Sequence, residues 1–415
     1  MASAGKGAGA GDGGNAGNMG ADDIRAKRLK ALPTYLFEEL ASIRRAREAE
    51  GKEVIDLSIG DPDLGAPAVA VEALVRHAAD TRLHRYPPDA AIESFSAAAC
   101  EWMHQRYGVD LDPSCEMLPL IGTKEGIALL PLAVMDPGDL ALVPDPGYPV
   151  YSRGVWFAGG RVEWMPLEQK RGFLPELGLI EKHRPRLVYL NYPNNPTSAV
   201  AGADFFTAAV NAAGRTGSVI ANDAAYSEIA FGGYVAPSIL QVEGARERTV
   251  EFHSFSKTFS MAGWRVGFAA GNRHMIASLR TLKSNVDSGV FGAVLMAAAA
   301  VIKEGWDAHR GMIEEYERRR AIVFDGLRAC GIGYHESPAT LYVWARVPGG
   351  RGSMEFARAL LEEAGILVTP GVGFGESGEG YFRMSITCPT DQVEIAGKRL
   401  HEVSRTWKGS ATWTK

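Results

Sequence analysis

The sequence has few cysteines, little net charge and no long apolar run, and each scarcity argues against a class of protein. No two of its four cysteines form a CxxC pair, so we expect reduced thiols in a cytoplasmic protein, without a disulfide framework or a metal site. The formal net charge of −5 over 415 residues gives no electrostatic reason to expect nucleic acid or an anionic membrane as a partner. Because no stretch of about 20 apolar residues occurs, no membrane-spanning helix is predicted. The cysteines are Cys100, Cys115, Cys330 and Cys388.

The length and composition predict a tail followed by two domains. Residues 1–22 are almost all small or polar and lack the features of a signal or transit peptide, so we expect a disordered, low-complexity tail. Hydrophobic residues make up 46% of the chain, which is ample for packed cores. A chain of this length favours one large domain, over residues 55–305, and a smaller one over residues 306–415. An arm and helix over residues 23–54 should belong to the smaller domain.

Short apolar runs alternate with longer helical patterns between Leu118 and Gly271. Strands buried on both faces and separated by helices predict an α/β domain with a mainly parallel sheet. The shorter runs after residue 306 predict a smaller α+β domain. Ligands of parallel sheets bind beyond the carboxyl ends of the strands, so functional residues are expected in the turns there. The clearest runs are Ala141–Val143, Leu187–Leu190, Ser218–Ala221, Thr249–Phe252 and Arg265–Ala270.

Four turns in this region carry polar residues, and each has an ordinary structural explanation. The segment Asn194–Thr197 is a good turn sequence, and Asp223 could be a helix N-cap. The serine-rich segment Ser254–Lys257 could be a solvated loop. The small residues of Gly122–Gly126 could cap a helix or hold a phosphate on free backbone N–H groups. It is their combination that points to one cofactor.

The combined motifs resemble those of class I/II aminotransferases, which depend on pyridoxal 5′-phosphate (PLP) and have the aspartate aminotransferase fold (fold type I). The stretch Ser254–Gly267 is similar to the lysine signature of that family, and the likeness extends from about Leu32 to about Leu400. Within the family, the chain most resembles LL-diaminopimelate aminotransferases and related alanine-type enzymes. The segments that carry this narrower likeness are Glu251–Lys257, Ser284–Phe291, Thr369–Gly371 and Gly378–Arg383.

The resemblance implies that Lys257 carries PLP as a Schiff base and moves a proton during catalysis. Asp223 would pair with the ring nitrogen, Asn195 and Tyr226 would hold the phenolic oxygen, and Tyr148 would stack on the ring. We therefore take Lys257, Asp223 and Tyr226 as candidate catalytic residues. The phosphate would be held by Thr123, Lys124, Ser254, Ser256 and Arg265, and by Tyr86 from the neighbouring subunit.

For the substrate, the resemblance implies that Arg383 binds the α-carboxylate in a bidentate pair. Gly60 matches a position where the backbone approaches that carboxylate, and Asn195 would also contact the substrate. Tyr35 would lie on the arm, near the substrate of the partner subunit. These roles imply a homodimer with shared active sites.

The expected function is transfer of an amino group between an amino acid and a 2-oxo acid by a ping-pong mechanism. A lyase, decarboxylase or oxidase that uses PLP on the same fold would share these residues, so the motifs leave that alternative open. A PLP-sensing regulator would need a DNA-binding domain, and the tail is too short and too uncharged to be one.

Two departures from the family pattern bear on the substrate. Ser198 stands where the family usually has glycine, which predicts either a different backbone conformation or strain of about 1 kcal/mol. The segment Ala90–Glu93 stands where a glycine often precedes the helix. A specialised substrate of a secondary pathway is therefore as plausible as diaminopimelate.

Overall fold

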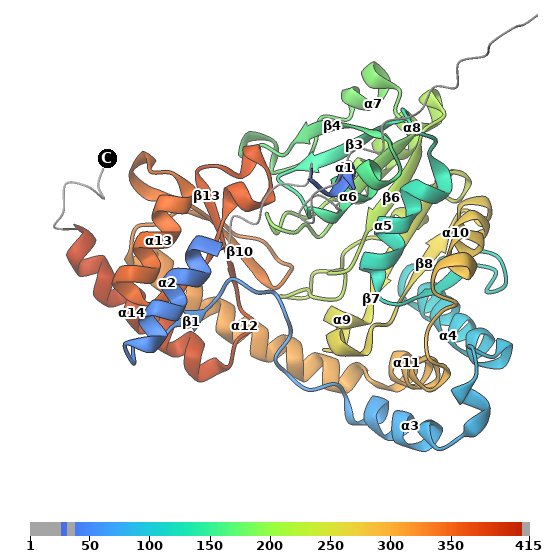
Figure 1. The fold of residues 1–415 in the computed structure, drawn as a ribbon, viewed down its shortest axis with the longest axis horizontal. Helices are drawn as coiled ribbons and strands as arrows, with labels where there is room; N and C mark the ends of the chain where they lie inside the picture. The colour runs from blue at the N-terminus through green and yellow to red at the C-terminus, as the bar shows by residue number, and fades with distance from the viewer. Residues whose placement is uncertain (1–25, 31–37, 409–415) are drawn as a thin grey trace, which may run out of the picture. The chain divides into compact units, whose positions relative to one another are not determined.

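The structure is a computed structural model that describes residues 26–30 and 38–408. The chain divides into two compact units, residues 1–35 and residues 36–415. Within the first unit the structure describes the short helix α1 (Lys27–Lys30). The predicted tail over residues 1–22 and the candidate Tyr35 lie outside the described residues. All that follows concerns the second unit (Figure 1), and the predicted domain boundaries stay a prediction.

The larger sheet of the described residues has seven strands in the order β2-β8-β7-β6-β5-β3-β4. The neighbours from β7 to β4 are parallel, and β8 is antiparallel to both β7 and β2. This confirms the predicted α/β fold with a mainly parallel sheet. The strands are β2 (Met117–Leu120), β3 (Leu140–Asp145), β4 (Arg161–Pro166), β5 (Leu187–Asn191), β6 (Val219–Asp223), β7 (Thr249–Ser254) and β8 (Gly267–Gly271).

Two details of this sheet differ from the sequence prediction. The outer strands β2 and β4 were not among the clearest apolar runs. β4 lies at the sheet edge, and Met165 is its one buried residue, so it forms no buried apolar run. The run predicted to begin at Arg265 begins as a strand only at Gly267, because Arg265 adopts a left-handed φ of 55° that a strand does not contain.

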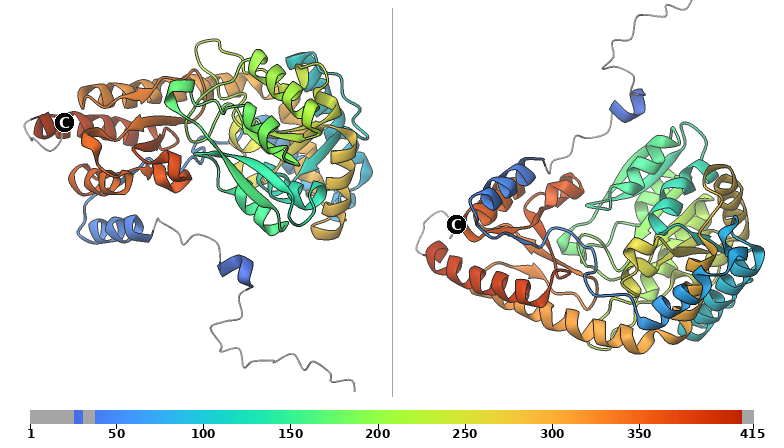
Figure 2. Two further views of the ribbon diagram at one scale, coloured as in Figure 1. Left: turned by 90° about the horizontal axis from the view of Figure 1, so that it is seen from above. Right: turned by 60° about the horizontal axis from the view of Figure 1, so that its bottom comes forward.

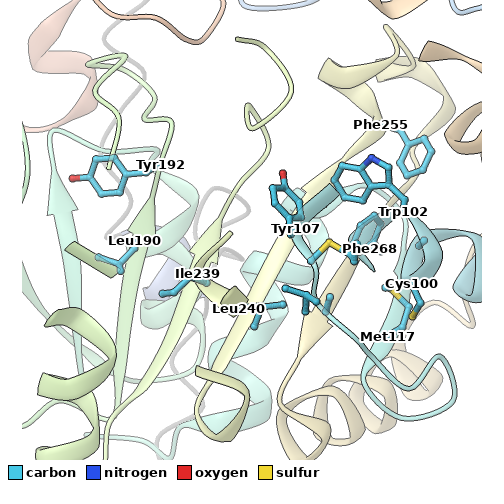
Figure 3. Close-up of a cluster of buried hydrophobic side chains, with 14 of the residues drawn as sticks. Cys100, Trp102, Tyr107, Met117, Leu190, Tyr192, Ile239, Leu240, Phe255 and Phe268 are labelled. Carbon is cyan, nitrogen blue, oxygen red and sulfur yellow. The ribbon is translucent and has the colours of Figure 1, made fainter. Parts of the chain in front are cut away.

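The sheet is buried on both faces because its side chains alternate between two cores. In β5, Leu187 and Tyr189 pack in a cluster with α5, α6 and α10, whereas Val188 and Leu190 pack in a second cluster with α4, α8 and α11. Figure 3 shows part of this second cluster, including Leu190. Burial of both faces explains why the strands are continuous apolar runs. The helices are α3 (Ala68–Ala78), α4 (Asp89–Tyr107), α5 (Thr123–Val134), α6 (Val150–Phe157), α7 (Gly178–His183), α8 (Ala203–Thr216), α9 (Phe255–Thr258), α10 (Arg273–Val286) and α11 (Gly292–Glu304).

A long helix, α12 (Trp306–Ala329), runs from α11 to α14 (Thr390–Lys408), as Figure 2 shows. Its buried residues Met312, Tyr316, Val323 and Leu327 are spaced four, seven and four residues apart and therefore share one helix face, which enters the core of a smaller sheet. That sheet is antiparallel, in the order β12-β13-β10-β9.

The remaining elements surround the smaller sheet and complete its core. β1 pairs in parallel with β11, and α2, α13 and α14 pack beside them. This arrangement confirms the predicted smaller α+β part. The elements are α2 (Glu38–Ala49), β1 (Ile55–Asp56), β9 (Tyr334–His335), β10 (Tyr342–Arg346), α13 (Ser353–Ala364), β11 (Ile366–Leu367), β12 (Thr369–Pro370) and β13 (Tyr381–Ser385). Among the described residues no helix is both long and apolar enough to cross a membrane.

Candidate functional site

Four parallel strands end at the same edge of the larger sheet. Their last residues are Asp145 of β3, Asn191 of β5, Asp223 of β6 and Ser254 of β7. The amide of Asn191 donates to the backbone oxygen of Asp223 at 2.7 Å, and its Oδ1 accepts the backbone N–H of Asn195 at 2.8 Å. The turn after β5 is therefore held beside the end of β6, as the strand-end argument predicts.

Asp223 is a buried carboxylate without a cationic partner among the described residues. Its Oδ2 accepts the hydroxyl of Tyr151 at 2.8 Å, and its Oδ1 accepts the backbone N–H of Ala225 at 3.2 Å. Burial raises the pKa of Asp223 to about 6, although the hydrogen bond from Tyr151 acts in the opposite direction. Burial, together with the nearby charge of Asp223, raises the pKa of Tyr148 to about 12. Both predicted residues therefore lie in one buried region.

Lys257 lies on the short helix α9, directly after β7. The hydroxyl of Ser254 caps this helix by accepting the backbone N–H of Ser256 at 3.3 Å. The Lys257 Nζ donates to the backbone oxygen of Gly60 at 2.5 Å. A Cβ atom on Gly60 would lie 2.1 Å from the hydroxyl oxygen of Tyr342, so this backbone position leaves no room for a side chain. The lysine thus meets the segment after β1 that the sequence singled out.

Arg265 brings a positive charge to the start of α5. Its Nη1 donates to the backbone oxygen of Ala262 at 2.8 Å, and a Cβ atom on Gly122 would lie 2.5 Å from its Nη2. Gly122 immediately precedes α5, whose first turn begins at Thr123 and has backbone N–H groups without partners in the helix. A guanidinium beside a helix N-terminus suits a bound anion. Lys124 is exposed on the same turn.

Arg383 is a buried cation on β13, only 7% exposed. Its Nη1 donates to Oδ1 of Asn195 and its Nη2 to the backbone oxygen of Ser58, each at 2.7 Å, while Nε has no partner among the described residues. The Arg383 Cζ lies 4.1 Å from the ring centre of Tyr342 and 4.6 Å from that of Phe374. Since both hydrogen bonds go to neutral oxygens, the guanidinium is available to a carboxylate.

Some predicted residues lie apart from this group or make an unexpected contact. Tyr86 is 83% exposed and lines a surface pocket of about 530 Å³ together with Gly289 and Val290. Tyr226 is buried, and its hydroxyl is 2.8 Å from that of Tyr342. The same hydroxyl was predicted to meet the cofactor, a role that stays a prediction.

The sequence reasoning missed Tyr151, Tyr342 and Phe374. A signal existed for Tyr151, which follows Tyr148 by three residues, and in the structure its backbone N–H donates to the backbone oxygen of Tyr148 at 3.2 Å, in the turn that leads into α6. Tyr342 lies in one of the short runs expected after residue 306, in β10, but nothing in that run showed which face meets the site.

Ser198, the departure from the family glycine, has a left-handed φ of 62°. The sequence predicted either a different backbone conformation or strain here, and the structure shows the left-handed conformation, which a serine adopts only with strain. The Ser198 hydroxyl is 2.7 Å from that of Thr340 and donates to the backbone oxygen of Tyr342 at 2.7 Å. It links the turn that carries Asn195 to the start of β10.

Comparison with known sequences shows the family of the chain. Residues 52–400 match the family described as aminotransferase class I and II. The chain is 46% identical to LL-diaminopimelate aminotransferase of Desulforudis audaxviator over 91% of this chain and 97% of that protein. It is 44% identical to the enzyme of the same name from Aquifex aeolicus over 90% of this chain and 97% of the relative.

Solved structures show the same fold. Substrate-bound BacF from Bacillus subtilis superimposes with a TM-score of 0.84 at 32% identity, covering 92% of this chain and 98% of BacF. A single mutant of Thermus thermophilus aspartate aminotransferase has a TM-score of 0.83 at 26% identity, covering 91% of this chain and 99% of the mutant enzyme. The predicted aspartate aminotransferase fold is thereby confirmed. The chain belongs to the class I and II aminotransferases, which use PLP to transfer an amino group between an amino acid and a 2-oxo acid.

Proposed function

We propose that this enzyme transfers an amino group between LL-diaminopimelate and a 2-oxo acid, with Arg383 as the binding site for the α-carboxylate. The relatives that bear the name LL-diaminopimelate aminotransferase are 44–46% identical over about nine tenths of the chain. The observation that carries the proposal is the buried Arg383, whose guanidinium contacts only neutral oxygens and aromatic rings and has a free Nε.

The residues at the strand ends fit PLP in three respects. Asp223 offers a buried carboxylate that lacks a cation, which suits a protonated ring nitrogen. Arg265 and the first turn of α5 form a cradle of positive charge and N–H groups, which suits the phosphate. Lys257 supplies an amine within the same region. When bound there, PLP provides a ring that accepts the electrons released from the substrate Cα.

The chain's own groups would then orient the reactants and move the proton. The Lys257 amine is the covalent attachment point and, once released, the base that takes and returns a proton at the substrate Cα. Asp223 keeps a proton on the ring nitrogen, and Tyr151 orients the Asp223 carboxylate through its hydrogen bond. Ser254, Ser256 and Thr123 add donors for the phosphate. Tyr148 stacks on the ring, while Asn195 and Tyr226 hold its phenolic oxygen.

Arg383 would fix the substrate so that its Cα faces Lys257. The connection between the two residues runs through Gly60, which accepts from Lys257 and packs against Tyr342, and through Tyr342, which lies on the Arg383 guanidinium. The aromatic rings of Tyr342 and Phe374 keep water from the guanidinium, which strengthens its attraction for a carboxylate. Fixed orientation of this kind lowers the barrier to reaction.

The proposal includes a cytoplasmic homodimer in which Tyr86 reaches the phosphate of the neighbouring site. Tyr86 is exposed in the single chain, and the large apolar side chains of Ile59, Val75, Val286 and Phe291 are also exposed. Burial of these side chains against another chain would remove their apolar surface from water. Light scattering of the purified protein tests the dimer, and a monomer at micromolar concentration would contradict it.

A spectroscopic titration tests the proposed function. LL-diaminopimelate should convert the absorption of the bound cofactor to that of its amine form, and a 2-oxo acid should restore it. The meso stereoisomer and alanine serve as competing donors. Release of ammonia or carbon dioxide without formation of the amine form of the cofactor would contradict transamination. Full conversion by alanine but not by LL-diaminopimelate would contradict LL-diaminopimelate as the substrate. The Lys257→Ala variant is the control and should show no turnover.

A further inference from the structure

One carboxylate joins the larger sheet to the loop before β13. Asp145 ends β3, and its Oδ2 accepts the backbone N–H of Ser377 at 3.1 Å and the hydroxyl of Ser377 at 2.8 Å. A second contact lies beside it, since the backbone N–H of Gly147 donates to the backbone oxygen of Phe374 at 2.9 Å. Segments more than 220 residues apart are thus held together by three hydrogen bonds.

The loop held by Asp145 carries an aromatic ring to Arg383. Phe374 belongs to this loop, and its ring centre lies 4.6 Å from the Arg383 Cζ. Gly147 is followed directly by Tyr148, the predicted ring-stacking residue. The Asp145 contact therefore connects the turn expected to hold the cofactor ring with the surroundings of the arginine expected to hold the substrate.

The packing around Asp145 leaves little freedom. Asp145 is 7% exposed, and its Oδ1 is buried without a hydrogen-bond partner among the described residues. A Cβ atom on Gly375 would lie 1.8 Å from this Oδ1, and Gly375 has a φ of 131°, so only glycine fits there. No cation among the described residues forms an ion pair with Asp145. A buried carboxylate held in this way without a cation is unfavourable for folding alone.

We infer that Asp145 is a positioning residue, which holds Phe374 against Arg383 and so sets the affinity of the site for the substrate α-carboxylate. The inference rests on the proposed role of Arg383 and extends it to a residue that touches neither substrate nor cofactor. Both half-reactions bind a molecule with an α-carboxylate. Loosening the loop should therefore weaken the amino acid and the 2-oxo acid alike, while the cofactor stays bound.

The test compares Asp145→Asn with Ser377→Ala in the PLP-loaded enzyme. Asp145→Asn replaces one acceptor oxygen by an N–H₂ group, and Ser377→Ala removes one donor from the other side of the same contact. We expect KM to rise about tenfold in Asp145→Asn and about threefold in Ser377→Ala, for donor and acceptor together. The kcat, the PLP dissociation constant and the absorption spectrum should stay close to wild type. Because the two variants disrupt one contact, the double variant should be no worse than Asp145→Asn.

The controls separate this inference from the proposed function. Asp139→Asn removes a carboxylate just before the opposite end of β3, where it accepts the backbone N–H of Asp136 at 2.9 Å, and should leave KM unchanged. Arg383→Lys should raise KM strongly. If Arg383→Lys raises KM but neither Asp145→Asn nor Ser377→Ala does, the inference is wrong and the role of Arg383 stands. If Arg383→Lys has no effect on KM, the substrate site itself is wrong. Parallel loss of PLP and of kcat in Asp145→Asn would also overturn the inference.

Discussion

The hydroxyl of Tyr151 donates a 2.8 Å hydrogen bond to Oδ2 of Asp223, and both side chains are buried. Burial raises the pKa of the Asp223 carboxyl group, and the hydrogen bond from Tyr151 acts against this by lowering it. It thus favours the ionised form that a protonated ring nitrogen needs. Tyr151 also stacks on Tyr189, at a ring distance of 5.0 Å, so its position is fixed from the side of the core.

Tyr151→Phe should weaken PLP binding about three- to tenfold, because one buried hydrogen bond to the charged Asp223 is lost. The dissociation constant can be measured by titrating cofactor-free protein with PLP and following its absorption. Tyr189→Phe is the matched control, since its hydroxyl is equally buried but donates to the backbone oxygen of Ile127 at 2.8 Å. Equal weakening by both substitutions would show that Tyr151 acts through packing, not through Asp223.

Asp223→Asn should stabilise the cofactor-free protein at neutral pH. The pKa of Asp223 is about 6 in the folded protein against 3.8 ordinarily, so between these values the folded state binds more protons than the unfolded state. Raising the pH through this window therefore lowers the free energy of unfolding of the wild type, by about 3 kcal/mol over the whole window. The advantage of the variant should be present at pH 7 and should fade near pH 4.

Urea unfolding of the cofactor-free protein at several pH values measures this difference. Glu243→Gln removes an exposed carboxylate and is the control, for which no such pH dependence is expected. With PLP bound the order should reverse, because the variant lacks the charge that holds the ring nitrogen. A constant difference from pH 4 to pH 7 would contradict the assignment of the window to Asp223.

The fold and most of the strand-end residues could be predicted from the sequence because both have local signals. Strands buried on both faces are apolar runs, and the polar residues that follow them share one edge of a parallel sheet. Asp223, Asn195 and Lys257 were found in this way. β4 was missed since an edge strand, with one face exposed, has no continuous run.

The contacts that surround Arg383 could not be predicted, because they join residues far apart in the chain. Ser58, Tyr342 and Phe374 meet Arg383 only through the pairing of strands and loops in the smaller sheet. Each has an ordinary sequence context, so no local pattern distinguishes it from a core or loop residue. The link between Asp145 and Ser377 was invisible for the same reason.

Ser198 allows backbone strain to be separated from hydrogen bonding. Both Ser198→Gly and Ser198→Ala lose the hydroxyl that contacts Thr340 and Tyr342. The left-handed φ at this position is unfavourable for alanine but not for glycine. The alanine variant should therefore be less stable than the glycine variant by about 1 kcal/mol. Thermal or urea unfolding measures both. Equal stability would mean that the turn relaxes out of its left-handed conformation once the hydroxyl is removed.

Shared active sites can be tested by mixing two inactive chains. Lys257→Ala removes the catalytic amine, and Tyr86→Ala removes the side chain proposed to reach the phosphate of the neighbouring site. If each site takes Lys257 from one chain and Tyr86 from the other, mixed dimers contain one intact site. Equal refolding of the two chains gives mixed dimers as half of the population, so about a quarter of wild-type activity should return. Arg265 is proposed to come from the same chain as Lys257 at each site, so a mixed dimer of Lys257→Ala and Arg265→Ala chains has one defect in each of its two sites. Placing Lys257→Ala and Arg265→Ala on separate chains should therefore restore nothing, and recovery there would contradict the proposed composition of the site.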